Sequence, residues 1–378
     1  MDLLITLILA KQRRKLRVRK AKCKYAGIVM QQALLYRKRL YLKERNFLHS
    51  AALFNSVVEA PWYKMYRDGS DSDFVTATSL TRASFEYLLI EFKKHYVFHS
   101  GPTKSGRPSR VKDHHCVLSL LLHRYCSPAE NKTWSEMFGI TPSTLIRTLA
   151  KGEAALLRTL NNLPEARVEW PSKEEQVAMA IKVQTVEPII LGRWGFIDGK
   201  NYRVAEPANC LVQNAMYNGW LHSVFVTGTA CFSVQGVIIW AKLNFFGSWN
   251  DSEMSREFMD ILSDSNRNED GHGVLSDSAF PVSSHMFGRI MTPLKDGDLS
   301  RAHRDARPAL MHLSAAITSM RQSAEWGMGA VCKVYRILNN KLSFDCKKRG
   351  QLLTVLHKLY NYRVRTTGIS QIKNYFNA

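Results

Sequence analysis

The feature that most constrains the fold is a succession of apolar runs, rich in β-branched and aromatic residues, in the second half of the chain. The three longest are PIILGRWGFIDGK (188–200), HSVFVTGTACFS (222–233) and GVIIWAKLNFF (236–246). Runs of this composition predict strands, and the second and third are joined through Val234-Gln235-Gly236, which predicts a hairpin. This part of the chain is therefore expected to build a sheet.

Helical patterns follow these strands. SEMSREFMDILSD (252–264) has helical spacing, VLSDSAF (274–280) reads as a short buried strand, and a helix-prone tract covers roughly 308–340. The order β-β-β-α-β-α predicts an α/β domain. It also predicts that Asp198 and Asp277 lie at the ends of apolar strands. A lone Asp in VLSDSAFP is more often a turn former than a ligand, so Asp277 needs support from other residues.

The third acid lies on the helix-prone tract. Its apolar residues are spaced by three and four along one helical face: Leu313, Ile317, Met320, Ala324, Met328 and Val331. Glu325 lies at the edge of that face, one turn after Arg321. The simplest interpretation of Glu325 is an ion pair with Arg321, worth only about 0.3–0.5 kcal/mol.

Together the three acids suggest a metal site. Clustered carboxylates repel one another unless cations are bound, and oxygen ligands select Mg²⁺ or Mn²⁺. Two such ions about 4 Å apart can activate water and clamp a phosphodiester.

The charge balance points to a polyanion. The chain has 378 residues with 53 Lys and Arg against 32 Asp and Glu, a net charge of +21. An excess of this size favours nucleic acid or an anionic surface. Residues 1–50 hold much of it, and KQRRKLRVRKAKCK (11–24) is basic at nine of 14 positions. This arm predicts a nuclear-localisation or phosphate-binding segment. A solvated, partly disordered tail is compatible with either role.

The opening MDLLITLILA does not resemble a secretion signal, because the basic block follows the apolar run instead of preceding it. The run is also far shorter than the ~20 residues of a membrane span. The seven cysteines are scattered without a CxxC pair, so neither a disulfide framework nor a zinc ribbon is indicated. We expect an intracellular protein that does not bind membranes.

Upstream of the sheet, helices are predicted. LTRASFEYLLIEFKKHY (80–96) has helical periodicity, with Thr81 and Ser84 available for capping. The segment 114–160 reads as helix, short helix, turn and helix. Within it, WSEMFGITPSTLIRTL has a helix-turn-helix rhythm, with the turn at Gly139 and the N-cap at Thr141.

Candidate DNA contacts lie in this region. Leu145 and Leu149 share the apolar face of the last helix, so Arg147 and Lys151 would point away from it, toward DNA if this is a true helix-turn-helix unit. A plain helical hairpin would look the same. Arg107, in GPTKSGRPSR (101–110), either enters an A·T-rich minor groove or belongs to a basic linker, and the linker is the simpler interpretation.

Four motifs in order make the resemblance specific: GFIDGKNYRV (195–204), FFGSWNDSEMS (245–255), GVLSDSAFP (273–281) and RQSAEWGMGAV (321–331). The chain from about residue 80 to 376 resembles the Harbinger superfamily of DDE transposases. The resemblance implies a ribonuclease-H-like α/β domain behind a helix-turn-helix segment. Two positions depart from the family pattern: Lys200 and Asn201 occupy the place of a frequent histidine, and Phe246 that of a proline.

Carried over by position, the resemblance makes Asp198, Asp277 and Glu325 the catalytic, metal-binding acids and gives Asp251 a supporting role. It implies two Mg²⁺ or Mn²⁺ ions. Arg321, beside the third acid, joins Arg147, Lys151 and Arg107 as a candidate DNA contact. We expect three parts: a basic arm (1–50), a helical, helix-turn-helix-like DNA-binding region (51–168) and the ribonuclease-H-like DDE domain with its C-terminal tail (169–378).

The function implied is metal-dependent DNA cleavage and strand transfer in the nucleus. Its partners would be double-stranded DNA (transposon ends and target), other copies of the chain on that DNA, and a Myb-like DNA-binding protein of the kind that parts of this family use. The alternative is a domesticated DNA-binding protein that keeps the fold without catalysis. The intact set of three acids argues against it. A decayed copy that folds poorly is a third interpretation.

Overall fold

The computed structural model describes residues 2–43, 56–98, 109–249, 251–278, 280, 286 and 288–377, with side chains described throughout these ranges except at 2–5, 38–43 and 251–253. The chain divides into two compact units, Met1–His49 and Ser50–Ala378. The predicted boundary between residues 168 and 169 falls inside the second unit and stays a prediction.

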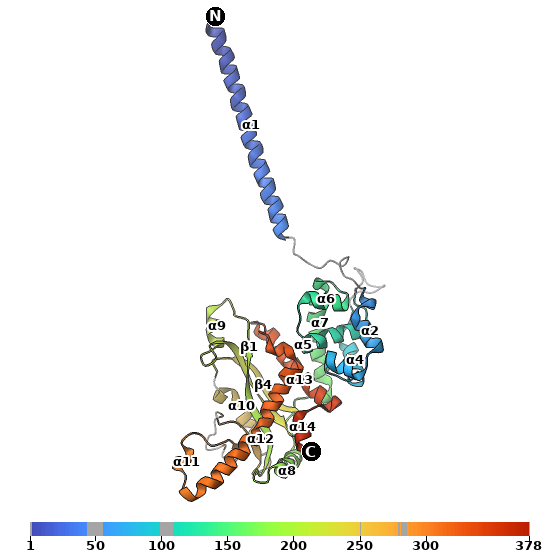
Figure 1. The fold of residues 1–378 in the computed structure, drawn as a ribbon, viewed down its shortest axis with the longest axis vertical. Helices are drawn as coiled ribbons and strands as arrows, with labels where there is room; N and C mark the ends of the chain where they lie inside the picture. The colour runs from blue at the N-terminus through green and yellow to red at the C-terminus, as the bar shows by residue number, and fades with distance from the viewer. Residues whose placement is uncertain are drawn as a thin grey trace. The chain divides into compact units, whose positions relative to one another are not determined.

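The first unit contains one long helix, α1 (Asp2–Lys43), drawn in blue in Figure 1. Every described side chain on it, from Thr6 to Arg37, is exposed. The continuous helix differs from the partly disordered tail that the sequence suggested. Its Leu, Arg, Lys, Gln and Ala residues are strong helix formers, and no proline interrupts them. Within the described ranges no helix, α1 included, is long and apolar enough to cross a bilayer.

The second unit begins with a helical region. Its elements are η2 (Val57–Glu59), α2 (Pro61–Asp68), α3 (Asp71–Thr78), α4 (Arg82–His95), α5 (His114–Cys126), α6 (Asn131–Phe138), α7 (Pro142–Asn162) and η3 (Pro164–Ala166). The predicted α4 is confirmed, with the Thr81 hydroxyl accepting from the backbone N–H of Ser84. Pro61 starts α2, since a proline fits the first turn of a helix, where its missing N–H is not needed.

The predicted turn between the last two long helices of this region is present. Gly139 ends α6 in the left-handed conformation, with φ of 63°, and Thr141 is the N-cap of α7. Leu145 and Leu149 are buried, whereas Arg147 and Lys151 are exposed. The helical faces therefore follow the predicted pattern, and contact with DNA stays a prediction.

A mixed sheet follows the helical region. Its strands are β1 (Arg193–Arg203), β2 (Tyr217–Asn218), β3 (Ser223–Ser233), β4 (Ile238–Phe246), β5 (Gly273–Leu275) and β6 (Ile290–Met291). β3 pairs antiparallel with β1, β4 and β2, and β5 pairs parallel with both β1 and β6. The predicted hairpin between β3 and β4 is confirmed, with Gly236 at φ of 77° in its turn.

The end of the first strand was predicted wrongly. β1 does not stop at Asp198 but continues to Arg203, because residues 199–203 stay paired with β3. What changes at Asp198 is exposure. The strand is buried from Arg193 to Ile197 and is partly exposed from Asp198 onward, with Tyr202 the buried exception. The sequence signal marked the end of the buried segment instead of the end of the strand.

Helices pack on this sheet and extend beyond it. They are α8 (Lys173–Val186), α9 (Cys210–Met216), α10 (Asp251–Ser263), α11 (Asp298–Arg301), α12 (Arg307–Val334), α13 (Cys346–Thr367) and α14 (Gln371–Phe376), with η5 (Arg304–Ala306) and η6 (Arg336–Asn339). α10 and α12 confirm the two helices predicted in this part. α12 contacts β1, β3 and β5, and α13 contacts β4 as well as α4 and α7.

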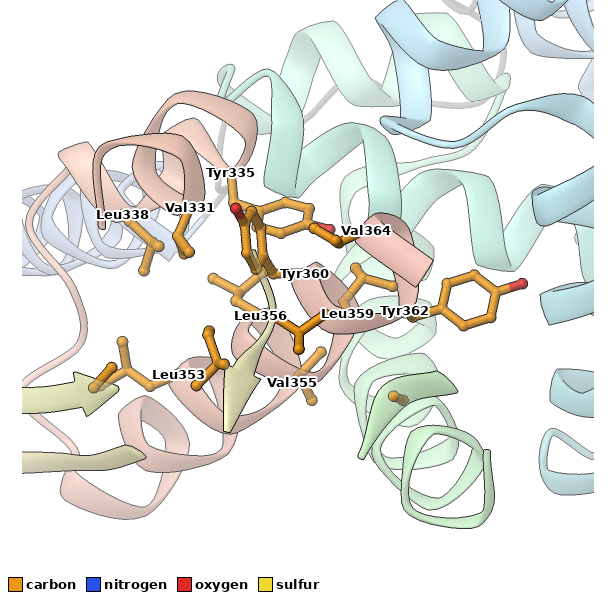
Figure 2. Close-up of a cluster of buried hydrophobic side chains, with 14 of the residues drawn as sticks. Val331, Tyr335, Leu338, Leu353, Val355, Leu356, Leu359, Tyr360, Tyr362 and Val364 are labelled. Atoms are coloured by element: carbon orange, nitrogen blue, oxygen red, sulfur yellow. The ribbon is translucent and has the colours of Figure 1, made fainter. Parts of the chain in front are cut away.

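α13 joins the helical region to the sheet. Apolar side chains of its central turns pack with Val331, Tyr335 and Leu338 in one buried cluster (Figure 2). Polar groups on the same helix reach both regions. The Tyr362 hydroxyl donates to the carbonyl of Ser84 at 2.6 Å, and the Asn361 side chain accepts from Ile238 N–H and donates to its carbonyl, both at 2.7 Å. These contacts hold the two regions together as one unit.

Candidate active site

Two aspartates lie side by side at the middle of the sheet. β1 and β5 run parallel, with Phe196 opposite Leu275. Asp198 and Asp277 each follow these paired residues by two positions, so the parallel register brings them to the same level. The Ser276 hydroxyl strengthens this junction by donating to the carbonyl of Ile197 at 3.4 Å.

Backbone N–H groups orient both carboxylates. One Asp198 oxygen accepts from Gly199 N–H at 2.8 Å, and one Asp277 oxygen accepts from Phe280 N–H at 3.0 Å. The second contact is the turn that the simpler interpretation of Asp277 predicted. The residue therefore forms a turn and also presents a carboxylate next to Asp198.

Both aspartates line one cavity of ≈ 310 Å³. Trp249, which is 41% exposed, also lines this cavity. Besides the two aspartates, its polar and charged lining residues are Lys200, Asn201, Asn218, Thr227 and Thr229. Several side-chain oxygens, the Lys200 cation and the aromatic rings of Trp249 and Phe280 thus surround the two carboxylates.

The environment of Asp198 disfavours its charged form. Burial is the largest cause that raises the pKa of this carboxyl, and with the nearby carboxylates of Asp277 and Glu325 it brings the pKa to about 6. The Gly199 N–H and the Arg321 guanidinium act in the opposite direction. Because Glu325 and Arg321 both influence Asp198, α12 brings the third predicted acid into the electrostatic range of the first.

Glu325 is held by its own helix. The Arg321 guanidinium lies 2.8 Å from its carboxylate, with the Glu325 side chain 50% and the Arg321 side chain 23% exposed. The predicted ion pair is therefore present. Glu325 does not line the cavity of the two aspartates.

A glycine allows α12 to approach the sheet this closely. A Cβ added at Gly327 would lie 2.6 Å from the ring of Phe232 on β3, closer than carbon atoms pack. Gly327 is two residues after Glu325. The close contact between Gly327 and Phe232 therefore sets the distance between this part of α12 and the sheet.

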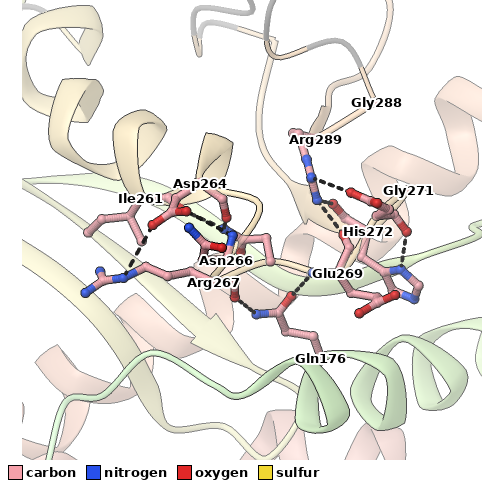
Figure 3. Close-up of polar contacts among 12 residues, drawn as sticks. Gln176, Ile261, Asp264, Asn266, Arg267, Glu269, Gly271, His272, Gly288 and Arg289 are labelled. Atoms are coloured by element: carbon pink, nitrogen blue, oxygen red, sulfur yellow. Dashed lines mark hydrogen bonds and ion pairs between the residues drawn. The ribbon is translucent and has the colours of Figure 1, made fainter.

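Two arginines hold the loop that leads into β5. Arg193 is 5% exposed and donates to the carbonyl of Gly271, just before β5, at 3.5 Å and to that of Gly288, just before β6, at 2.6 Å. Arg289 donates to the carbonyls of Glu269 and His272 and lies 3.3 Å from the Asp270 carboxylate, as Figure 3 shows. These contacts fix the start of β5, the short strand that ends two residues before Asp277.

A divalent cation suits the donors of this cavity. In the described part of the chain no three His, Cys, Asp or Glu side chains are arranged to hold one ion together. Mg²⁺, however, is commonly bound through one or two carboxylates and keeps several waters. Asp198 and Asp277 meet that requirement, and the cavity has room for water.

The remaining predicted residues lie elsewhere. Arg147 and Lys151 are exposed on α7, in the helical region. Asp251 begins α10, but its side chain lies outside the described residues, as does all of Arg107. Arg321 is engaged by Glu325, so its predicted role in binding DNA competes with this ion pair.

The sequence did not single out several residues of the cavity wall as functional, Trp249 and Lys200 among them. Trp249 stands in the GSWND motif, so its signal was present in the sequence. Lys200 was noticed only because it departs from the family pattern, and its position next to Asp198 depends on the continuation of β1 that was missed.

Comparison with known proteins gives one match. Residues 197–361 match the family described as DDE superfamily endonuclease. The matched segment begins one residue before Asp198 and includes Asp277 and Glu325, whereas the helical region lies outside it. No match was found among curated proteins or among solved structures.

Proposed function

We propose that the protein uses residues 197–361, which match the family described as DDE superfamily endonuclease, to cleave DNA phosphodiester bonds in a reaction that depends on a divalent metal. One observation carries this proposal. The parallel register of β1 and β5 brings Asp198 and Asp277 to the same level, and both line one cavity.

In this proposal Asp198 and Asp277 supply the first metal ligands, as Mg²⁺ or Mn²⁺ prefers oxygen donors. A bound ion would polarise the scissile phosphate and lower the pKa of an attacking water. Glu325 would be the third ligand if its carboxylate turned from Arg321 toward the aspartates. A second ion would be held by the same three acids, with Asp251 in a supporting role.

The other residues of the cavity wall fit a nucleic-acid substrate. Lys200 places a positive charge beside the two aspartates, where a phosphate would approach. Trp249 is half exposed at the same cavity, and an aromatic ring in that position can stack on a base. Arg147 and Lys151 would bind DNA through the exposed face of α7.

We further propose that the domain is ribonuclease-H-like and belongs to the Harbinger superfamily. The antiparallel pairing of β4, β3 and β1, continued by the parallel strands β5 and β6, supports this fold. Strand transfer, action in the nucleus, assembly of several copies on DNA and a Myb-like partner belong to the same proposal. They rest on the sequence resemblance and on the charge of +21.

The test is cleavage of a supercoiled plasmid carrying the ends of the matching element, in Mg²⁺ or Mn²⁺ and in EDTA. We expect nicking by the wild-type protein only with metal. Asp198→Asn and Asp277→Asn should abolish it, because each removes one ligand charge with little change of shape. Asp260→Asn, an exposed change on α10 outside the cavity, should cleave as the wild type does.

The alternative, a DNA-binding protein without catalysis, predicts a different result. Wild type and both cavity variants would then bind the plasmid ends equally well and cleave nothing. Circular dichroism of each variant establishes that it is folded. Metal-dependent cleavage that survives Asp277→Asn would overturn the assignment of the site.

A further inference from the structure

A second cavity lies between the helical region and the start of α13. It measures ≈ 350 Å³ and is formed by the end of α5, the start of α6, part of α7, and the segment from η6 into α13. It is lined by residues that do not line the cavity of Asp198 and Asp277. Its size is at the lower end of the range for ligand-binding cavities.

Positive charge dominates this wall. Arg124, Lys341, Lys348 and Arg349 line the cavity, and Glu153 is the single acid among its lining residues. Burial raises the pKa of the Glu153 carboxyl, although Arg124 acts against the shift. The cavity is therefore strongly cationic even with Glu153 ionised.

Arg349 is the buried member of this set. Its side chain is 1% exposed; Nε donates to the Asn244 side-chain oxygen at 2.5 Å, and Nη1 donates to the carbonyls of Ser343 and Phe344 at 2.9 and 3.0 Å. Nη2 is buried and has no hydrogen-bond partner within the described residues. Asp345, the N-cap of α13, accepts from the backbone N–H of Lys348; its charge raises the pKa of Arg349, but burial acts more strongly and lowers that pKa.

A buried guanidinium with neutral partners is costly unless an anion compensates it. Lys341 and Lys348 add ammonium groups at the exposed side of the same cavity. Lys341 also lies 3.1 Å from Glu206, so it is partly neutralised, whereas the pairing of Lys348 in the described residues is confined to its backbone. The first turns of α13 contribute the positive end of a helix dipole.

We propose that this cavity is a phosphate-binding site, separate from the nuclease centre. Arg124 and Lys348 would contact the phosphate oxygens. Arg349 would add a positive charge from the buried wall of the cavity. A phosphate dianion or a phosphodiester would satisfy the same groups. Its source is either free phosphate or the DNA backbone, and the experiment separates the two. The proposal does not depend on cleavage, so a protein that cleaves nothing can still have this site.

The first arm uses thermal unfolding of the full chain in inorganic phosphate and in chloride at equal ionic strength, without metal. A ligand that binds only the folded state raises Tm. We expect phosphate to raise Tm in the wild type, with about tenfold weaker phosphate binding in Lys348→Gln, since the variant cannot make one of the charge-assisted hydrogen bonds. Lys347→Gln is the matched control, because the adjacent lysine is exposed and does not line the cavity.

Glu153→Gln tests the sign of the effect. Removing the single acid among the lining residues should tighten phosphate binding. If the substitution changed only the stability of the protein, Tm would change by the same amount in phosphate and in chloride. The substitution leaves Arg349 untouched, so it avoids a variant that fails to fold. Equal Tm in phosphate and chloride, or equally weakened phosphate binding in Lys347→Gln and Lys348→Gln, would overturn the proposal.

The second arm uses a duplex oligonucleotide in EDTA, with phosphate as competitor. If the site takes a backbone phosphate, Lys348→Gln weakens DNA binding more than Lys347→Gln, and phosphate displaces the DNA. If it takes free phosphate, the two variants bind DNA equally, while the Tm response stays specific to Lys348. Either result supports the site and identifies its ligand.

Discussion

The Arg321 guanidinium lies 2.8 Å from the carboxylate of Glu325, one turn later on α12. The acid at the edge of the candidate active site is thus paired with a cation of its own helix. The same guanidinium lowers the pKa of the Asp198 carboxyl, which Glu325 raises. Arg321 therefore acts on two of the three acids and competes with any cation that approaches them.

We predict that Arg321→Gln tightens Mn²⁺ binding by about two- to fivefold, because the ion pair is weak and its removal frees Glu325. Glu325→Gln should weaken binding. The measurement is free Mn²⁺ by electron paramagnetic resonance, without DNA. Lys333→Gln, an exposed change on the same helix, controls for the removal of one positive charge. If Arg321→Gln binds Mn²⁺ no better than Lys333→Gln, Glu325 does not reach the metal.

Gly327→Ala should destabilise the protein by about 1–3 kcal/mol, because the added Cβ overlaps the ring of Phe232 and pushes α12 off the sheet. Gly329→Ala is the matched control. A Cβ there meets nothing within 4 Å, and alanine favours the helix by about 1 kcal/mol. Urea unfolding of the two variants gives the comparison. If both variants unfold at the same urea concentration, the close approach of α12 to β3 is wrong.

Local patterns were sufficient to predict much of this fold. The spacing of Ile317, Met320 and Ala324 predicted the buried face of α12, and Val234-Gln235-Gly236 predicted the turn between β3 and β4. These features depend on residues close in sequence, whose periodicity or turn chemistry is visible directly.

Other features depend on partners far apart in sequence. The continuation of β1 beyond Asp198 results from its pairing with β3, which begins at Ser223, 20 residues after β1 ends at Arg203. Asp198 and Asp277 lie at the same level because Phe196 pairs with Leu275 across the two parallel strands. No local sequence pattern specifies that register. The second cavity required the packing of α13 against the helical region, and its central residue, Arg349, has no distinguishing sequence signal.

The basic helix α1 gives a prediction about charge alone. Alanine at Arg13, Arg14, Lys15, Arg17 and Arg19 removes five cations while keeping strong helix formers. DNA affinity should become less dependent on salt. The slope of the logarithm of the binding constant against the logarithm of the salt concentration should become shallower by up to about 0.9 for each phosphate that the variant no longer neutralises. Nuclear accumulation should fall as well. The control is alanine at Gln31 and Gln32 on the same helix. An unchanged slope and unchanged localisation would leave α1 without a role in either process.

Two buried histidines predict how stability depends on pH. Burial lowers the pKa of both His123 and His357 from 6.5 to about 4, although each ring nitrogen Nδ1 lies within hydrogen-bond distance of a backbone carbonyl, at 3.2 Å from Ser119 and 2.8 Å from Leu353. The unfolded chain therefore binds more protons than the folded protein between about pH 4 and 6.5. Stability contributed by the neutral rings is complete above pH 6.5 and is lost as the pH falls toward 4, by roughly 3 kcal/mol at most per histidine.

His357→Gln should remove part of this dependence. The variant is expected to have a lower Tm than the wild type at pH 7, because a packed side chain is replaced, but its Tm should fall less between pH 7 and pH 5. The control is His303→Gln, since the His303 side chain is 80% exposed and lies outside the buried core. Calorimetry of the three proteins across this range measures the slopes. Parallel slopes for wild type and His357→Gln would mean that the buried ring accepts a proton in the folded state.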